Sequence, residues 1–379
     1  MQAHLSYLLL VPLALLAPAT GCDDDPSRPA MDAGADLGEP DLTRPRDGLA
    51  QDAGRDATQA PDGGAPDAPS ALPFLAGVNL ASAEFGSSLP GTYDKDYTYP
   101  TQAEVDYFVT KGMNVFRLPF RWERLQPSEK GALDSVELGR VDAFVAHATA
   151  RGAHVVLDPH NYARYYGQLV GTEVGDDALA DLWSKLAAHF KANPKVIFGL
   201  MNEPHDMTTE LWRDDANAAI QAIRAAGATN LILVPGNGWT GAHGWGQSYY
   251  GTPNAQVMKS IVDPGNNYAF EVHQYMDSDS SGTSATCVSG TVGADRLKDF
   301  TAWLQQNGLR GFLGELGAAS NPTCLTALDN MLSHIDANKA QWIGWTYWAA
   351  GPWWGSYMFS IEPQGSADAP QMPTIEKHL

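Results

Sequence analysis

The sequence predicts a (β/α)8 barrel, on three observations. Eight short apolar segments follow one another between residues 76 and 349, and their continuous apolar character is typical of strands buried on both faces. Longer amphipathic stretches with helix signals separate them. The series occupies about 300 residues, within the usual length of eight strand–helix units in one domain. An open, doubly wound sheet is the rival arrangement, but no glycine-rich phosphate loop follows the first segment.

The predicted strands are defined by the apolar runs themselves. Each run is short and rich in apolar residues, and helical stretches or polar loops flank it. In chain order the strands are AGVNL (76–80), NVFRLPF (114–120), HVVLDPH (154–160), VIFGLMN (196–202), LILVPGN (231–237), YAFEVHQY (268–275), GFLGELG (311–317) and WIGWTYWA (342–349).

Helix signals fill the intervals between these strands. Thr101 and Glu104 form a capping-box pattern ahead of an apolar helical repeat, and Gly112 is placed to end that helix. Asp134 and Glu137 repeat the pattern in the next interval. Further helices are predicted over residues 176–192, 208–226, 292–307 and 323–338. Each helix would return the chain to a new strand, as a barrel requires.

Residues 1–22 differ from everything that follows them. The segment from Leu5 to Ala17 is almost wholly apolar but too short to span a bilayer comfortably, and small residues lead from it to Cys22. This predicts a secretory signal whose end resembles the bacterial lipobox, in which the cysteine is lipidated. The product would be a cell-surface or periplasm-facing lipoprotein, or an ordinary secreted protein if no lipid is attached. Residues 23–72 contain no aromatic residue, which predicts a flexible linker ahead of one domain over residues 73–379.

The net charge and the cysteines narrow the range of partners. The chain carries a net charge of −20, and residues 23–72 hold 12 acidic residues against 4 arginines. An acidic surface argues against nucleic acid or an anionic polysaccharide and favours a neutral substrate. With Cys22 assigned to the anchor, Cys287 and Cys324 remain, and an even pair in an exported chain predicts a disulfide. Two unpaired buried thiols are the alternative.

Polar and aromatic side chains stand at the ends of the predicted strands. Two are glutamates, Glu203 and Glu315, and a carboxylate at the end of a buried strand is poorly solvated, which is typical of acid/base or nucleophilic work. In a barrel all these strand ends meet at one face. Two carboxylates with hydrogen-bonding and aromatic groups in one cleft indicate glycoside hydrolysis. The accompanying residues are Arg117, His160, Asn202, His273, Tyr275 and Trp348.

Several of these residues lie in motifs that resemble glycoside hydrolase family 5. The motifs are NEP on the fourth strand, HNY after the third, HQY on the sixth, GE on the seventh, AEFG (83–86) and YWAAGPWWGSYMFSIEP (347–363), and the last two resemble the endo-β-1,4-glucanases of subfamily 5. The resemblance covers residues 74–379. It implies hydrolysis of β-1,4-glucosidic bonds in a β-glucan, without cofactor or metal.

The resemblance also implies a role for each residue at the strand ends. Glu203 would be the general acid/base and Glu315 the nucleophile of a retaining mechanism, with their carboxyl groups about 5 to 5.5 Å apart. The six accompanying residues would hold the reacting sugar, and Tyr275 would donate a hydrogen bond to Glu315. Four loop tryptophans are candidates for further sugar platforms or for simple packing: Trp239, Trp245, Trp353 and Trp354.

Three alternatives remain at this point. A β-mannanase or a broad β-glucanase would share the catalytic residues and differ in the loops. A metal-dependent hydrolase would use His160, His273 and a glutamate as ligands, although no HxH follows the first strand. A non-catalytic sugar-binding surface protein, tethered through Cys22, is the third.

Overall fold

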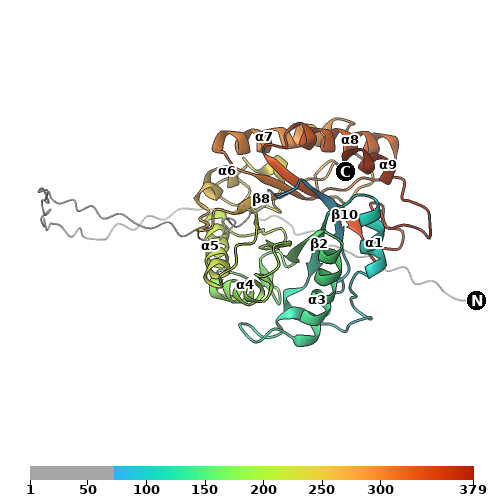
Figure 1. Cartoon of the computed structure of the whole chain (residues 1–379). Helices are drawn as coiled ribbons and strands as arrows, with labels where there is room; N and C mark the ends of the chain where they lie inside the picture. Colours follow the sequence, from blue (N-terminus) through green and yellow to red (C-terminus); the bar gives the residue numbers. More distant parts are fainter. Residues whose placement is uncertain (1–71) are drawn as a thin grey trace, which may run out of the picture. The chain divides into compact units, whose positions relative to one another are not determined.

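The computed structural model describes residues 72–379, in which eight parallel strands close into a barrel (Figure 1). In order around the ring, each strand pairs with the next, and β10 closes the ring on β1. This closure confirms the predicted (β/α)8 barrel and excludes the open sheet. The strands are β1 Leu75–Leu80, β2 Val115–Phe120, β3 His154–Pro159, β6 Val196–Gly199, β7 Ile232–Pro235, β8 Tyr268–His273, β9 Gly311–Glu315 and β10 Trp342–Ala350.

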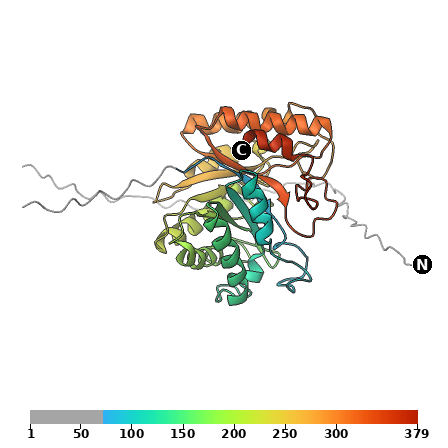
Figure 2. The ribbon, with the colours of Figure 1, turned by 45° about the vertical axis from the view of Figure 1, so that its right-hand side comes forward.

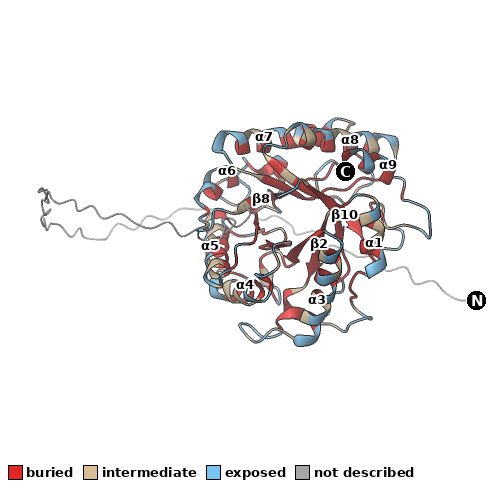
Figure 3. Ribbon diagram, viewed as in Figure 1, coloured by how far each residue is buried: buried red, intermediate tan, exposed pale blue. Residues whose placement is uncertain are grey.

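Helices cover the outside of the barrel, and the views in Figures 1 and 2 agree that α7 lies beside α8. Their inner faces are buried and their outer faces exposed, as amphipathic helices require (Figure 3). The long helices are α1 Gln102–Thr110, α3 Ser135–Ala150, α4 Asp176–Phe190, α5 Thr209–Ala225, α7 Val292–Asn307 and α8 Pro322–Ala337. The shorter elements are α2 Trp122–Leu125, α6 Asn254–Val257, α9 Met372–Ile375, the strands β4 Arg164–Tyr165 and β5 Gln168–Leu169, and 3-10 turns at Ala242–Gly244, Met258–Ser260 and Glu376–His378.

The two predicted capping boxes have different outcomes. At α1 the box is complete, because Thr101 and Glu104 each accept a backbone hydrogen bond from the other. At α3 the side chain of Asp134 accepts from two backbone N–H groups, but Glu137 does not return a bond. The carboxylate of Glu137 instead accepts hydrogen bonds from the hydroxyls of Tyr97 and Tyr99, which are buried beside it. The second half of the predicted box at α3 is therefore wrong.

The alternation of side chains along each strand builds the barrel interior in layers. On β2 Val115 joins the apolar cluster inside the barrel, so Arg117, two residues on, faces the same way. On β3 Val156 belongs to that cluster, and Asp158 is the next inward position. A charged layer therefore lies above the apolar one, towards the carboxyl ends of the strands.

Part of the predicted N-terminal organisation lies outside the described residues. This applies to the signal segment of residues 1–22 with Cys22, and to the predicted linker up to residue 71. No helix within residues 72–379 combines the length and apolar character that crossing a membrane requires. The predicted disulfide is confirmed: Cys287 and Cys324 are bonded, which ties the loop after β8 to the first turn of α8.

Candidate active site

Arg117 is the centre of the charged layer and is fully buried. Burial alone would lower its pKa, but the surrounding carboxylates outweigh burial and raise it, so the guanidinium stays charged. Two of its partners, Asp158 and Glu271, are carboxylates on strand interiors. Its contacts are Nη1 to Asn79 Oδ1 (3.0 Å) and Glu315 Oε1 (3.1 Å), Nη2 to Asn202 Oδ1 (2.9 Å) and Asp158 Oδ2 (3.1 Å), and Nε to Glu271 Oε1 (2.9 Å).

Glu315 ends β9 and is held through both carboxylate oxygens. Arg117 Nη1 donates to Oε1 at 3.1 Å, and the Tyr275 hydroxyl donates to Oε2 at 2.6 Å. The residue is almost completely buried. Its carboxylate therefore has a fixed orientation beside a permanent cation.

Glu203 lies in the loop after β6 with a left-handed backbone, at φ +43°. For a residue with a side chain this conformation costs about 1 to 2 kcal/mol and persists only where the surrounding structure enforces it. Its Oε1 lies 2.7 Å from Nδ1 of His273. Its side chain is 17% exposed, against 5% for Glu315, so Glu203 is the more open of the two to the cleft.

His273 lies between the two glutamates at the end of β8. Its Nδ1 is 2.7 Å from Glu203 Oε1 and 3.6 Å from Glu315 Oε2. Burial alone would lower its pKa, but the charge of Glu315 and hydrogen bonds to Glu203 and Glu271 raise it to about 10. The imidazole is therefore protonated at neutral pH.

These contacts bear on the alternative of a metal-dependent hydrolase. In the described part of the chain, one group of three could supply metal ligands: Glu203, His273 and Glu315, with ligand atoms within 4.8 Å of one another. His160, which the metal hypothesis required, is not in that group, and its Nδ1 lies 2.8 Å from Asp158 Oδ2. The ligand set that the sequence suggested is not assembled.

His160 and Trp348 form another part of the site. Their rings are stacked, with centroids 5.4 Å apart and planes 17° from parallel. Burial lowers the pKa of His160 well below its usual value, and the nearby Arg117 lowers it further despite the opposing charge of Glu315, so the ring is neutral. Asn202 lies beside them, buried, with its Oδ1 bound to Arg117 and its Nδ2 without a partner within residues 72–379.

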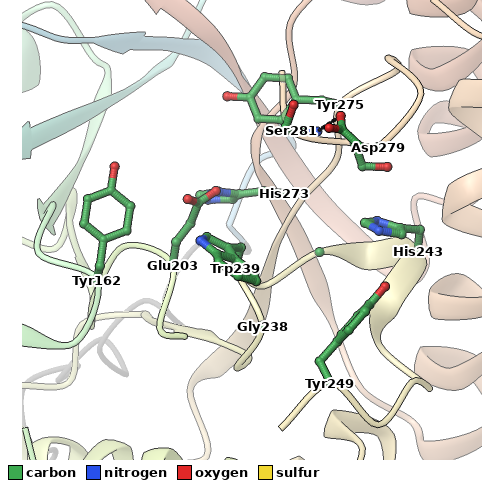
Figure 4. A pocket seen from close by; sticks show the side chains of 12 residues that line it. Tyr162, Glu203, Gly238, Trp239, His243, Tyr249, His273, Tyr275, Asp279 and Ser281 are labelled. Atoms are coloured by element: carbon green, nitrogen blue, oxygen red, sulfur yellow. Dashed lines mark hydrogen bonds and ion pairs between the residues drawn. The ribbon is translucent and has the colours of Figure 1, made fainter. Parts of the chain in front are cut away.

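A cavity of about 490 Å³ opens beside Glu203, His273 and Tyr275. Figure 4 shows the carboxylate of Glu203 against the ring of His273 in this cavity. Sequence reasoning missed several residues around it. Asp158 and Glu271 contact Arg117 and do not line the cavity, and their signal was a carboxylate at an inward position of an apolar strand. The missed lining residues lie in loops, and among them only Tyr162 belongs to a motif that the sequence offered, HNY. The missed residues that line the cavity are Tyr162, Gly238, Gly241, His243, Tyr249, Asp279, Ser280 and Ser281.

The four loop tryptophans have different environments. Trp239 is 45% exposed and lines the cavity with Glu203, and Trp353 is 51% exposed and lines a second hollow near the C-terminus. Trp354 is partly buried, with its ring stacked on Tyr357 at 4.5 Å. Trp245 is only 2% exposed. Its ring packs against Phe270, Phe300 and Trp303, between β8 and α7.

The suggestion that Trp245 binds sugar is therefore wrong. The reason is local: a 3-10 turn over Ala242–Gly244 turns the chain inward, and α7 then covers the ring. A ring with no exposed face cannot stack on a ligand.

A closed barrel with two glutamates converging at the carboxyl ends of its strands is the arrangement that barrel-type glycoside hydrolases use. The sequence model of the family described as "Cellulase (glycosyl hydrolase family 5)" matches residues 76–351, and the chain belongs to this family. The chain is 42% identical over 305 residues to endo-beta-1,4-glucanase B of Aspergillus niger, covering 80% of this chain and 89% of that protein.

Solved structures agree with this assignment. The endo-beta-1,4-glucanase Xac0029 from Xanthomonas axonopodis pv. citri is 50% identical, with a TM-score of 0.79 over 80% of this chain and 98% of that one. Pseudomonas stutzeri endoglucanase Cel5A in complex with cellobiose is 36% identical, with a TM-score of 0.74 over 80% and 92%.

Proposed function

We propose that this chain is a retaining endo-β-1,4-glucanase that cleaves internal bonds of cellulose or related β-glucans. One observation carries the retaining mechanism: a carboxylate oxygen of Glu203 and one of Glu315 lie within 4.8 Å of each other. Retaining enzymes hold their two carboxyl groups about 5 to 5.5 Å apart, whereas inverting enzymes leave about 6.5 to 9.5 Å for a water molecule. The shorter separation supports direct attack by one glutamate.

Glu315 is the proposed nucleophile. Arg117 donates to one of its carboxylate oxygens, and Tyr275 donates to the other, so the side chain is fixed in one orientation. A carboxylate oxygen of Glu315 would form a bond to the anomeric carbon while the bond from that carbon to the glycosidic oxygen breaks. The product of this step is a glycosyl ester on Glu315.

Glu203 is the proposed general acid/base. It would give a proton to the departing oxygen, then take one from the water that attacks the ester and releases Glu315. Its carboxyl group lies 2.7 Å from the ring of His273, and Glu203 is the glutamate that is more open to the cleft.

The reacting sugar would be held by His160, Asn202, His273 and Trp348. The Nδ2 of Asn202 supports this, because it is a buried donor with no hydrogen-bond partner among residues 72–379 and is suited to a sugar hydroxyl. Trp239 and Trp353 would contact further sugars along the chain, since each ring is about half exposed. We do not extend this role to Trp354, whose ring packs on Tyr357 and, edge-on, against Phe85 and Trp348.

Two measurements test the proposal. Glu203→Gln and Glu315→Gln should each reduce release of reducing ends from carboxymethylcellulose at least about a thousandfold without changing the fold. Proton NMR of the first products should show the β-anomer before mutarotation. A first product with the α-configuration would contradict the retaining mechanism.

A β-mannanase or a broad β-glucanase would share all of this chemistry. Initial rates on carboxymethylcellulose, mixed-linkage glucan, xyloglucan and mannan, measured side by side, decide among them. The proposal requires a glucan to lead. A leading rate on mannan would refute the substrate assignment and leave the mechanism intact.

We also propose that the enzyme is exported and that Cys22 carries a lipid anchor, on the pattern of residues 1–22. A neutral glucan outside the cell is the partner that this location and the acidic charge favour. Metabolic labelling with a fatty acid, lost in Cys22→Ser, would support the anchor. An unlabelled wild type in the culture medium would indicate the ordinary secreted form.

A further inference from the structure

We propose that His205 is a positioning residue that supports the ring of Trp239 as a platform for the sugar on the leaving-group side of the cleft. This inference rests on the proposed function, because it takes Glu203 as the acid next to the departing oxygen.

The two rings are in direct contact. Their centroids are 4.6 Å apart and their planes 14° from parallel. The backbone N–H of Trp239 donates to the carbonyl of Pro204 at 3.1 Å, so the loop after β7 is attached to the loop that carries Glu203. Because His205 covers one face of the indole, only the other face is available to a ligand, and Trp239 lines the same cavity as Glu203.

His205 is itself fixed from its other side. Its Nδ1 lies 2.8 Å from Asp206 Oδ2, and the hydroxyl of Tyr250 donates to Asp206 Oδ1 at 2.7 Å. Arg164 lies 3.3 Å from Asp206 Oδ2 and donates to the carbonyl of Tyr162 at 2.7 Å. Loops after β3, β6 and β7 therefore meet at this ring.

The protonation of His205 is consistent with this role. Burial lowers its pKa, the hydrogen bond to Asp206 opposes that effect, and the charge of Arg164 adds to it. A neutral His205 ring at pH 7 donates a hydrogen bond from its Nδ1–H to Asp206. It then stacks on the indole of Trp239 without bringing a charge to the contact between the two rings.

The backbone supports a rigid arrangement as well. Glu203, Asp206 and Trp239 all have left-handed φ values, of +43°, +56° and +55°. Such conformations in residues with side chains persist only where the surroundings enforce them. The catalytic carboxyl group and the platform are thus held by the same strained loops, and His205 lies two residues from Glu203. A sugar that stacks on Trp239 would be placed next to the proposed acid, on the side that departs.

The test compares two β-1,4-linked glucosyl substrates that differ in the leaving group. Cellopentaose places sugars on the leaving-group side, whereas the leaving group of β-cellobiosyl fluoride is a single atom. His205→Ala should lower kcat/KM for cellopentaose about threefold to tenfold more than it lowers kcat/KM for the fluoride, the range expected for the loss of one aromatic contact. Trp239→Ala should show the same split. His205→Phe retains a flat ring and should recover most of the loss.

Each contrary result has a distinct meaning. Equal losses on both substrates would show that His205 acts on Glu203 and would overturn the inference, as would no loss or no recovery with His205→Phe. If His205→Ala does not fold, as judged by circular dichroism, Trp239→Ala and His205→Phe still decide the question. A wild type that hydrolyses neither substrate would instead contradict the proposed function.

Discussion

Asp215 on α5 provides a direct test of how burial acts on a charge in this protein. The residue is fully buried, and neither of its carboxylate oxygens has a hydrogen-bond partner within residues 72–379. Burial, with smaller contributions from Asp176 and Asp214, raises its pKa from 3.8 to about 7. One pKa unit corresponds to about 1.4 kcal/mol, so ionising Asp215 costs the folded state up to about 4 kcal/mol.

The sign follows from the two pKa values. Below about pH 4 the carboxyl group is protonated in both states and has no effect on stability. As the pH rises from about 4 to 7, the unfolded chain ionises while the folded protein keeps its proton, so the free energy of unfolding falls. Above pH 7 both states ionise and the loss stays constant.

Asp215→Asn removes this titration. We expect the variant to gain about 2 to 4 kcal/mol relative to the wild type between about pH 4 and pH 8, the lower value allowing for local relaxation and water entry. The buried amide also lacks a partner, but that cost is the same at both pH values. Urea unfolding followed by tryptophan fluorescence measures the difference. Asp214→Asn, at an exposed neighbouring position, is the control and should differ from the wild type by less than about 0.5 kcal/mol. An Asp215→Asn difference that does not change with pH would refute the reasoning.

Three further predictions follow from single contacts. Tyr275→Phe removes one hydrogen bond to Glu315. The kcat on carboxymethylcellulose should therefore fall about tenfold to a hundredfold, with no change in the unfolding midpoint. An unchanged kcat would show that Arg117 alone orients the carboxylate. Trp353→Ala should raise KM for a polymeric glucan about threefold and raise KM for β-cellobiosyl fluoride less. Equal increases would show that the ring does not contact the glucan chain. Cys324→Ser opens a disulfide whose cysteines are 37 residues apart. Because the unfolded chain then gains conformational entropy, the free energy of unfolding should drop by about 3 to 4 kcal/mol. A drop below about 1 kcal/mol would indicate that the unfolded loop is constrained in another way.

The barrel could be predicted because each of its strands is buried on both faces and therefore apolar throughout. VFRLPF of β2 and HVVLDP of β3 show how far this goes: every residue is buried, and the one charged residue in each marks the inward layer. The strand ends were also readable, since Glu315 directly ends an apolar run. Glu203 was readable from the same signal, because the apolar run of β6 continues to Met201, although the strand itself ends at Gly199, four residues before Glu203.

The loops could not be predicted in the same way. Trp239 and Trp245 are six residues apart in one glycine-rich loop, yet one ring is half exposed and the other is buried. The difference comes from a left-handed backbone at Trp239 and from the packing of α7 over Trp245, and neither leaves a trace in local composition. The partner of Glu137 illustrates the same limit, because two tyrosines about 40 residues away compete successfully with its own helix terminus.

The charge balance of the inner layer links the fold to the proposed chemistry. Two buried cations, Arg117 and His273, face four carboxyl groups, those of Asp158, Glu203, Glu271 and Glu315. A low-dielectric interior does not tolerate two uncompensated negative charges, so some of these carboxyl groups must keep a proton.

Burial raises the pKa of Asp158 to about 7 despite the charge of Arg117, so this carboxyl group is only partly ionised at neutral pH. The pKa of Glu271 is lowered, since Arg117 and His273 together outweigh its burial. A retaining glycosidase needs one ionised and one protonated carboxyl group in the same cleft. An excess of carboxyl groups over cations favours retention of a proton in this layer, and Arg117 places its positive charge beside Glu315, the proposed nucleophile.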